Sequence, residues 1–229
     1  KPKVLNVPGG ELCINSDQIM QLKTIPKKLS IIGAGYIALE FAFIFSLLGS
    51  KVNLFCRNKI LKGFDKDLVK YVEKSLSSFG VKIFYKEEVA KVEILNKLKR
   101  IKLMRSNDII TADEVLCAIG REPNTNDLKV KNIGLKINKN NAIEVNNKLE
   151  TNIKNIFALG DVTDRVNLTP VAIAEGHALA DKLYGNKNFK KLDLNYVGSA
   201  VFSTPPICSI GPSEEIAKKA FKHIQIYES

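Results

Sequence analysis

Cysteine is scarce in this sequence, and its spacing forms no paired motif. The four residues lie far apart along the 229-residue chain, at Cys13, Cys56, Cys117 and Cys208. Because zinc sites and small disulfide frameworks use closely paired cysteines, the spacing supports neither, and we expect no metal site. Cys56 and Cys117 fall inside apolar runs that resemble strands, a pattern that indicates buried and unreactive thiols.

Long uncharged apolar runs are also missing. The longest apolar stretch, residues 31–49, contains Glu40 and falls short of the ~18 uncharged residues that a membrane-spanning helix needs, so it predicts a buried helix. The first ten residues, KPKVLNVPGG, hold neither a long apolar core nor a small-residue cleavage site, which predicts no signal peptide. We therefore expect no membrane partner and, by default, a cytoplasmic location; a presequence that this fragment lacks is the alternative.

Arginine is rare although the chain is basic. The net charge is +11, but only five of the 35 basic residues are arginines, and the lysines are scattered among acids and asparagines. Recognition of nucleic acid favours clustered arginines or stacking aromatics, and no basic helix here carries interleaved aromatics. We expect no nucleic-acid partner and attribute the charge to a lysine-rich composition.

Alternating strand and helix patterns dominate what is present. They predict a βαβ unit, a second helix and strand, an antiparallel meander and a buried closing strand. These elements span residues 28–32, 36–48, 51–56, 66–79, 81–86, 89–111 and 113–120. Ser16-Asp17 is the expected cap of a short helix before them.

A linker-like segment, residues 124–152, follows the closing strand, and the pattern then predicts a strand over 155–161. Thr169 is the expected N-cap of a helix that runs to about Tyr184, with Pro170 at its first position. A new set of elements begins near Leu192 and includes a capped helix that starts near Ser213.

Gly33-Ala34-Gly35-Tyr36-Ile37-Ala38 has the form G-x-G-x-x-A. Gly33 permits a tight turn, Gly35 lets a pyrophosphate approach the backbone, and Ala38 lets the helix pack closely on the strand. Glycine spacing alone is a weak signal, but here it follows a strand and opens a helix. The motif therefore predicts dinucleotide binding.

The residues after the second strand indicate which dinucleotide binds. An NAD site presents an acid there, about 20 residues beyond the glycines, to bind the ribose 2′-hydroxyl. This chain presents Arg57, with Lys59 and Lys62 close behind. Positive charge suits a 2′-phosphate and favours NADP, although the lysines could also be ordinary solvated surface.

The segment LGDVTD places Gly160 and Asp161 at the end of the expected strand, before the Thr169-Pro170 helix. An acid that accepts from a polyol hydroxyl, beside a helix N-terminus that stabilises an electron-rich ring, would suit a flavin. Gly-Asp turns after strands are common, so this segment alone leaves a plain structural turn open.

Four segments together resemble a known family. IIGAGYIALEFAFIFSLLGSKVNLFCR, LCAIGREPNT, NIFALGDVTDRVNLTPVAIAEGHALADKLY and SAVFSTPPICSIG resemble, in this order and spacing, the glutathione reductase branch of the pyridine nucleotide–disulfide oxidoreductases. The resemblance covers nearly the whole chain and implies NADPH and FAD as cofactors. It also implies a disulfide substrate, first of all glutathione disulfide, and a homodimer of the complete protein.

The fold class that follows is α/β. We expect a Rossmann-like dinucleotide-binding domain with βαβ units and an antiparallel β-meander, then part of a FAD-binding domain and the start of an α+β dimer-interface domain. The expected segments are 1–23 (tail of the FAD-binding domain), 24–122 (NAD(P)H-binding), 123–190 (FAD-binding) and 191–229 (dimer interface).

The resemblance implies a role for each candidate site residue. Gly33, Gly35 and Ile37 would lie along the NADPH pyrophosphate, while Arg57 and Lys62 would hold its 2′-phosphate. Tyr36 would cover the nicotinamide pocket, for which a plain surface aromatic is the alternative. The remaining contacts implied are Gly120 and Arg121 against NADPH near the flavin, Gly160 and Asp161 at the FAD ribityl chain, and the backbone at Leu168 and Thr169 near the flavin pyrimidine edge.

Glu40 is a lone carboxylate in a helix that is apolar almost all round. A buried carboxylate needs a partner, and the resemblance implies an ion pair with a lysine beside the flavin N5, from a segment absent here. A surface-facing helix position is the alternative.

The sequence departs from the family in lacking the first flavin-binding segment, the C-x-x-x-x-C dithiol and the C-terminal His-Glu pair; neither His177 nor His223 has a matching acid. We expect a central fragment that is inactive alone. Arg57 disfavours lipoamide dehydrogenase, whereas trypanothione and mercuric reductases stay open, as does a catalytically idle module that senses NADPH.

Overall fold

The computed structural model describes residues 1–185 and 188–228. The chain divides into two compact units, and each is described by itself. The sheet unit consists of Pro2–Gly120 together with the chain from Ala200 onward, and the central unit consists of Lys1 and Arg121–Ser199.

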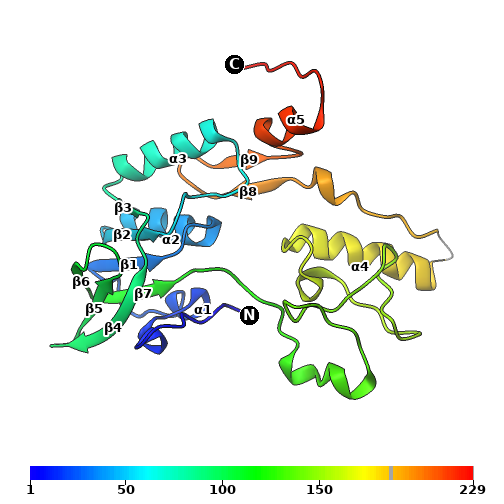
Figure 1. Ribbon diagram of the computed structural model, residues 1–229, viewed down its shortest axis with the longest axis horizontal. Helices are drawn as coiled ribbons and strands as arrows, with labels where there is room; N and C mark the ends of the chain where they lie inside the picture. The colour runs from blue at the N-terminus through cyan, green and yellow to red at the C-terminus, as the bar shows by residue number, and fades with distance from the viewer. Residues whose placement is uncertain (186–187, 229) are drawn as a thin grey trace. The chain divides into compact units, whose positions relative to one another are not determined.

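A four-stranded parallel sheet forms the centre of the sheet unit (Figure 1). Its strand order is β3-β2-β1-β7. The strands are β1 (Lys28–Ile32), β2 (Lys51–Cys56), β3 (Lys82–Tyr85) and β7 (Glu114–Cys117), and the connecting helices are α2 (Tyr36–Leu47) and α3 (Lys66–Ser78). Parallel neighbours joined through helices define an α/β fold, which confirms the predicted fold class.

Successive side chains of a strand point to opposite faces of the sheet, and here both faces are buried. Leu29 and Ile31 of β1 belong to the core that includes α2 and α3. Ile32 and its neighbour Phe55 belong to a second core, on the side of the antiparallel meander. A parallel sheet covered on both faces explains why these strands are nearly continuous apolar runs.

The meander consists of three antiparallel strands in the order β4-β5-β6. They are β4 (Val89–Leu95), β5 (Leu98–Leu103) and β6 (Ile109–Ala112). Asn96 and Lys97 connect the first two strands, and both have positive φ, 52° and 65°, as a two-residue type I′ turn requires. The predicted meander is confirmed.

The residues after Ala200 pack against the same helices. The short hairpin β8 (Ser199–Val201) and β9 (Ile207–Ser209) contributes Val201 and Ile207 to the core that contains α2 and α3. Helix α5 (Glu214–Ala220) starts after Ser213 as predicted, but the Ser213 side chain makes no cap hydrogen bond. Instead, Glu214 N donates to the Asp65 carboxylate at 2.7 Å.

Helix α1 (Ser16–Ile19) corrects the predicted cap by one residue. Its N-cap is Asn15, whose side chain accepts from Asp17 N and Gln18 N in a capping box. The Gln18 side chain in turn accepts from the Asn15 amide, so the capping box satisfies three backbone amides. A 3₁₀ helix, η1 (Gly10–Leu12), precedes it.

The central unit has one α-helix among its described residues, α4 (Thr169–Tyr184), with four 3₁₀ helices. These are η2 (Asn126–Leu128), η3 (Val130–Ile133), η4 (Gly160–Thr163) and η5 (Leu194–Tyr196). The segment 124–152 was expected to be linker-like, but it is folded: Val130, Leu135 and Ile143 form a small core with Ala158.

Two further predictions for the central unit were wrong. Residues 155–161 do not form a strand, because Phe157 makes only an isolated bridge to Glu150 and the chain then enters η4. A strand needs a continuous neighbour to pair with, and none adjoins it in the described residues. Helix α4 begins at Thr169 itself, with Leu168 as N-cap, so Pro170 occupies the second position.

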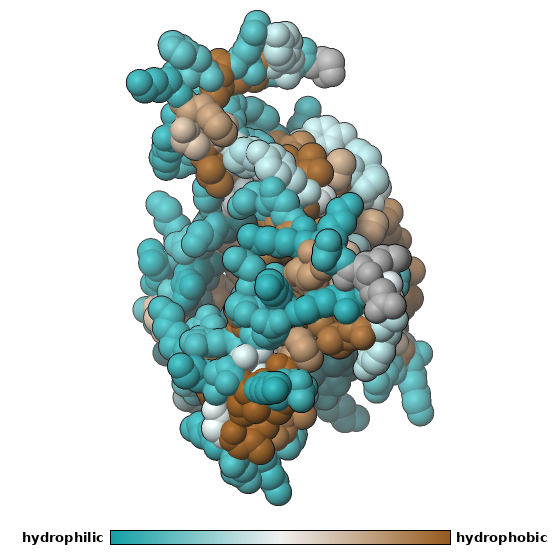
Figure 2. Space-filling model, turned by 90° about the vertical axis from the view of Figure 1, so that its right-hand side faces the viewer, coloured by the Kyte–Doolittle hydropathy of each residue, from teal (hydrophilic) through white to brown (hydrophobic). Residues whose placement is uncertain are grey.

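The surface and the helix lengths bear on the expectation that no segment crosses a membrane. Hydrophilic side chains cover most of the face shown in Figure 2. Within the described part of the chain, no helix combines the length and apolarity needed to cross a bilayer. Cys56 and Cys117 are buried as expected, and burial raises the pKa of both thiols.

Candidate functional site

The glycine turn lies at the carboxyl end of β1. The chain continues from β1 to β2 on one side of the sheet, and β7 pairs with β1 on the other side, so the strand order reverses here. Open α/β sheets bind ligands at this switch point. Gly33 has φ of 141°, and a Cβ atom there would lie 2.2 Å from Ala118 O. Gly33 N also donates to Phe55 O at 3.1 Å. The protein's own packing therefore requires glycine at position 33.

Gly35 is different, because nothing in the protein requires it to be glycine. Its φ of −84° suits any residue, and a Cβ atom would meet no atom within 4 Å. Gly35 is exposed and is the N-cap of α2, with no side chain capping the helix. The open space lies at the N-terminus of α2, where no side chain caps the helix and the helix dipole is positive, which is the arrangement that binds phosphate.

The basic residues after β2 lie beside this turn. Leu61 N donates to Ala34 O at 2.9 Å, which ties the loop of residues 57–62 to the glycine motif. Arg57, Lys59 and Lys62 are all exposed. Three exposed cations next to this turn create a positive field at the carboxyl edge of the sheet.

The first turns of α2 carry the remaining candidates of this edge. Tyr36 is 39 % exposed, and Ile37 and Glu40 are half-buried. Glu40 Oε1 accepts from Phe202 N at 3.0 Å, so its partner in this chain is a backbone amide just after β8. The lysine partner stays a prediction.

The prediction that this apolar stretch is a buried helix was only half right. Ala38, Ala42 and Phe43 are fully buried, but Ile44 and Leu47 are exposed. An α-helix at the edge of a unit turns one face away from the core, so continuous apolarity does not mean burial on every side.

Gly120 and Arg121 fall on either side of the division between the units. Gly120 follows β7 with φ of 114°, a conformation that favours glycine, and its carbonyl accepts from Lys3 N at 3.0 Å. Arg121 is exposed and belongs to the central unit.

The central unit brings Arg121 and Asp161 together. Both line a cavity of about 220 Å³, to which Asn167 also contributes. Gly160 is buried with φ of 66°, and a Cβ atom there would lie 2.9 Å from Ala172 Cβ, so only glycine fits. Asp161 itself is exposed.

Leu168 and Thr169 form the N-terminus of the 16-residue helix α4, where no side chain caps the first amides. Leu168 is half-buried and Thr169 is exposed. The four central-unit features, a cation, an anion, a cavity and an uncapped helix end, provide donors and an acceptor for a large polar ligand.

A comparison with protein-family models shows which family this chain belongs to. Residues 1–176 match the family model described as pyridine nucleotide-disulphide oxidoreductase. The chain belongs to this family.

Similar members of the family agree with that assignment. The trypanothione reductase of Trypanosoma congolense is 39 % identical over 232 residues, covering 100 % of this chain and 47 % of that protein. The chloroplastic/mitochondrial glutathione reductase of Pisum sativum is 39 % identical over 230 residues, covering 99 % and 41 %. The resemblance to the glutathione reductase branch is confirmed.

Solved structures give the same result. The HOCl-induced flavoprotein disulfide reductase RclA from Escherichia coli matches with a TM-score of 0.89 and 29 % identity, over 96 % of this chain and 51 % of that one. The predicted cofactors, NADPH and FAD, agree with a pyridine nucleotide family and a flavoprotein neighbour. The chain spans about half the length of the relatives it matches.

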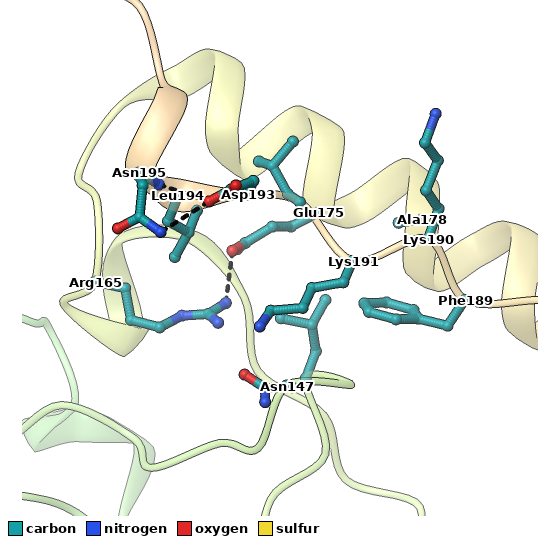
Figure 3. Close-up of a pocket in the computed structure, with 12 residues that line it drawn as sticks. Asn147, Arg165, Glu175, Ala178, Phe189, Lys190, Lys191, Asp193, Leu194 and Asn195 are labelled. Atoms are coloured by element: carbon teal, nitrogen blue, oxygen red, sulfur yellow. Dashed lines mark hydrogen bonds and ion pairs between the residues drawn. The ribbon is translucent and has the colours of Figure 1, made fainter. Parts of the chain in front are cut away.

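Sequence reasoning missed a pair of residues in this chain. Glu175 of α4 is only 5 % exposed and forms an ion pair with Arg165 at 2.5 Å, beside a cavity of about 200 Å³ (Figure 3). Glu175 stands within VAIAEGHALA, so the signal that singled out Glu40, a lone acid in an apolar helix, would also have found it.

Proposed function

We propose that the complete protein is an NADPH-dependent, FAD-containing disulfide reductase, most like glutathione reductase. The observation that carries this proposal is Gly35, an exposed glycine that the protein's own packing does not require. A residue without structural reason to be glycine, at an uncapped helix N-terminus beside three cations, is explained by a phosphorylated ligand that approaches the backbone.

The sheet unit would hold NADPH. Its pyrophosphate would lie over Gly33, Gly35 and Ile37 at the N-terminus of α2. The exposed guanidinium of Arg57, with Lys62, would hold the 2′-phosphate that distinguishes NADPH from NADH. Tyr36, at the first helical position, would cover the nicotinamide pocket, and Gly120 would lie against the same cofactor.

The central unit fits part of a FAD site. Asp161 presents an exposed carboxylate at a cavity and would accept hydrogen bonds from ribityl hydroxyls, with Gly160 fixing the turn. The uncapped amides after Leu168 and at Thr169 would face the electron-rich end of the flavin ring. Arg121 in the same cavity would place a cation near the nicotinamide. Bound FAD supplies the relay of electrons from NADPH to a disulfide.

Glu40 would work at the redox centre. Its Oε1 is held by Phe202 N, which fixes the carboxylate on α2 and leaves it able to pair with the predicted lysine beside the flavin N5.

We propose glutathione disulfide as substrate, with the trypanothione and mercuric types as alternatives from the same family. Segments 24–122, 123–190 and 191–229 would be the NADPH, FAD and dimer-interface parts of a homodimer.

Exposed apolar side chains support the interface part of the proposal. Phe202, Ile210 and Phe221 are 56–72 % exposed, and a second subunit that packs on this segment would cover them. This chain alone would not turn over substrate. The cytoplasmic location stays a prediction.

Cofactor preference tests the proposal on the 229-residue chain. Isothermal titration calorimetry should show tighter binding of NADPH than of NADH. Arg57→Ala should weaken NADPH binding by about 1–3 kcal/mol, the scale of a lost charge-assisted contact, and leave NADH binding unchanged.

Arg105→Ala is the matched control, because it removes the same charge from an exposed arginine in the turn after β5. It should leave both affinities unchanged. Equal affinity for the two cofactors, or an equal effect of the two substitutions, would contradict the assignment of Arg57.

A further inference from the structure

Glu175 is a buried carboxylate whose two oxygens are both held by one short segment of chain. Oε2 accepts from Gly160 N at 2.8 Å, and Oε1 accepts from Arg165 Nη2 at 2.5 Å. Figure 3 shows the Arg165 guanidinium pointing from its loop to the Glu175 carboxylate on α4. Glu175 therefore connects the helix to both ends of the turn that carries Asp161.

Two more hydrogen bonds close a circuit around that turn. Arg165 Nε donates to Thr163 Oγ1 at 3.3 Å, and Thr163 Oγ1 donates to Gly160 O at 2.7 Å. The circuit thus runs from Glu175 to Gly160, Thr163, Arg165 and back. Asp161 lies inside the enclosed span but takes no part in the circuit, and its carboxylate is exposed.

The burial of Glu175 restricts how far the turn can move from α4. A carboxylate that is 5 % exposed is stable only when it is paired and fully hydrogen-bonded, so any movement of the turn away from α4 leaves charge unsatisfied. Gly160 cannot relax in the other direction, because Ala172 of α4 already fills the space where a Cβ would stand. The turn therefore has little freedom relative to the helix.

We propose that Glu175 and Arg165 are positioning residues that fix Asp161 for ligand binding. Both line a cavity to which Asp161 does not contribute, whereas Asp161 lines the cavity shared with Arg121. Glu175 and Arg165 therefore act on the ligand through the turn and not by contact. This inference rests on the proposed function of Asp161 as an acceptor for the FAD ribityl chain.

A double-mutant cycle in the full-length protein tests the proposal, with the FAD dissociation constant measured by fluorescence on reconstitution of the apoprotein. Glu175→Gln keeps the shape but turns an amide N–H toward a donor, so FAD binding should weaken about tenfold. Asp161→Ala should weaken it at least as much. In the Asp161→Ala background, Glu175→Gln should change the FAD dissociation constant by less than about twofold. The reason is that Glu175 acts on FAD through Asp161, so its effect disappears once the Asp161 carboxylate is removed.

Glu150→Gln is the control. It breaks another ion pair of α4, between Glu150 and Lys182 at 2.6 Å, without touching the turn, and FAD affinity should stay within about twofold. Arg165→Gln provides a second variant at the partly exposed end of the circuit, should Glu175→Gln fail to fold by circular dichroism. It should weaken FAD binding in the same coupled manner.

The outcomes separate the two proposals. If Asp161→Ala leaves FAD binding unchanged, the proposed function of Asp161 fails, and the positioning role fails with it. If Asp161→Ala weakens binding but Glu175→Gln does not, or if the two effects simply add, the positioning role alone is overturned.

Discussion

Two buried serines of the sheet unit differ in whether their hydroxyl has a partner. Ser50 is 8 % exposed, and its Oγ donates to Pro26 O at 2.6 Å. Ser30 of β1 is fully buried, and its Oγ has no hydrogen-bond partner in the described chain. An unpaired buried hydroxyl carries a desolvation cost of about 1–3 kcal/mol that a paired one largely avoids.

The two serines should therefore respond in opposite ways to alanine. Ser30→Ala should raise the free energy of unfolding by about 1 kcal/mol, because it removes an unsatisfied group, whereas Ser50→Ala should lower it by about 1 kcal/mol. Urea denaturation of the 229-residue chain measures both. A loss of stability in Ser30→Ala would show that the hydroxyl does have a partner in solution.

Single residues also show where sequence reasoning reaches and where it stops. Each of the two acids in apolar helices has a partner in the structure: Phe202 N for Glu40 and Arg165 for Glu175. The lysine expected for Glu40 stays a prediction. The sequence does not show which of the two acids is more deeply buried, because burial depends on which helix face meets the core. Glu175 is 5 % exposed, whereas Glu40 in α2 is half-buried. Gly35 and Gly33 look alike in the motif, and only the structure shows that packing explains one of them.

The turn between β5 and β6 depends on a side chain from another element. Glu87, in the loop after β3, accepts from Arg105 N at 2.8 Å and from Ser106 N at 3.2 Å. The Arg105 amide, followed by that of Ser106, holds the pKa of Glu87 below its usual range. A carboxylate with a lowered folded-state pKa contributes stability above its unfolded pKa, about 4.3, and loses it as the pH falls through the folded value.

Glu87→Gln should therefore lower stability at pH 7 and flatten the decline of stability as the pH falls below the unfolded pKa of about 4.3. Urea midpoints of the wild type and the variant across that range provide the comparison. Glu88→Gln removes the neighbouring acid without removing either bond to the turn, and its profile should follow the wild type. Parallel profiles for Glu87→Gln and the wild type would exclude this contribution.

At the scale of elements, periodicity predicted the βαβ core within a residue or two at each end, because strands and helices with strong apolar patterns fold as the pattern indicates. The segment 155–161 shows the limit. Its apolar run suggested a strand, but pairing depends on a neighbouring strand that no local pattern reveals. The predicted helix caps were wrong for a similar reason. Asn15 caps α1 in place of Ser16-Asp17, and Asp65 accepts from the first amide of α5 in place of Ser213.

The whole molecule consists of two units with unequal cores. The sheet unit buries two large apolar clusters, on both faces of its parallel sheet. The central unit buries a small cluster around Val130 and Leu135, and most of its described chain is irregular or 3₁₀. Regions with few buried apolar contacts open locally at low free energy, so the two units should differ in stability.

Amide hydrogen exchange followed by mass spectrometry should reveal this difference in the 229-residue chain. Helices α2 and α4 form the fairest comparison, because both are regular helices, of 12 and 16 residues, and local hydrogen bonding alone would protect them equally. Peptides from α2 should exchange more slowly, since α2 buries Leu39, Phe43 and Phe45 in the large core, whereas α4 buries only Val171, Glu175 and Leu179. Equal protection of the two helices would mean that the small core is as stable as the large one, and that Asp161 stands on a scaffold as rigid as the glycine turn.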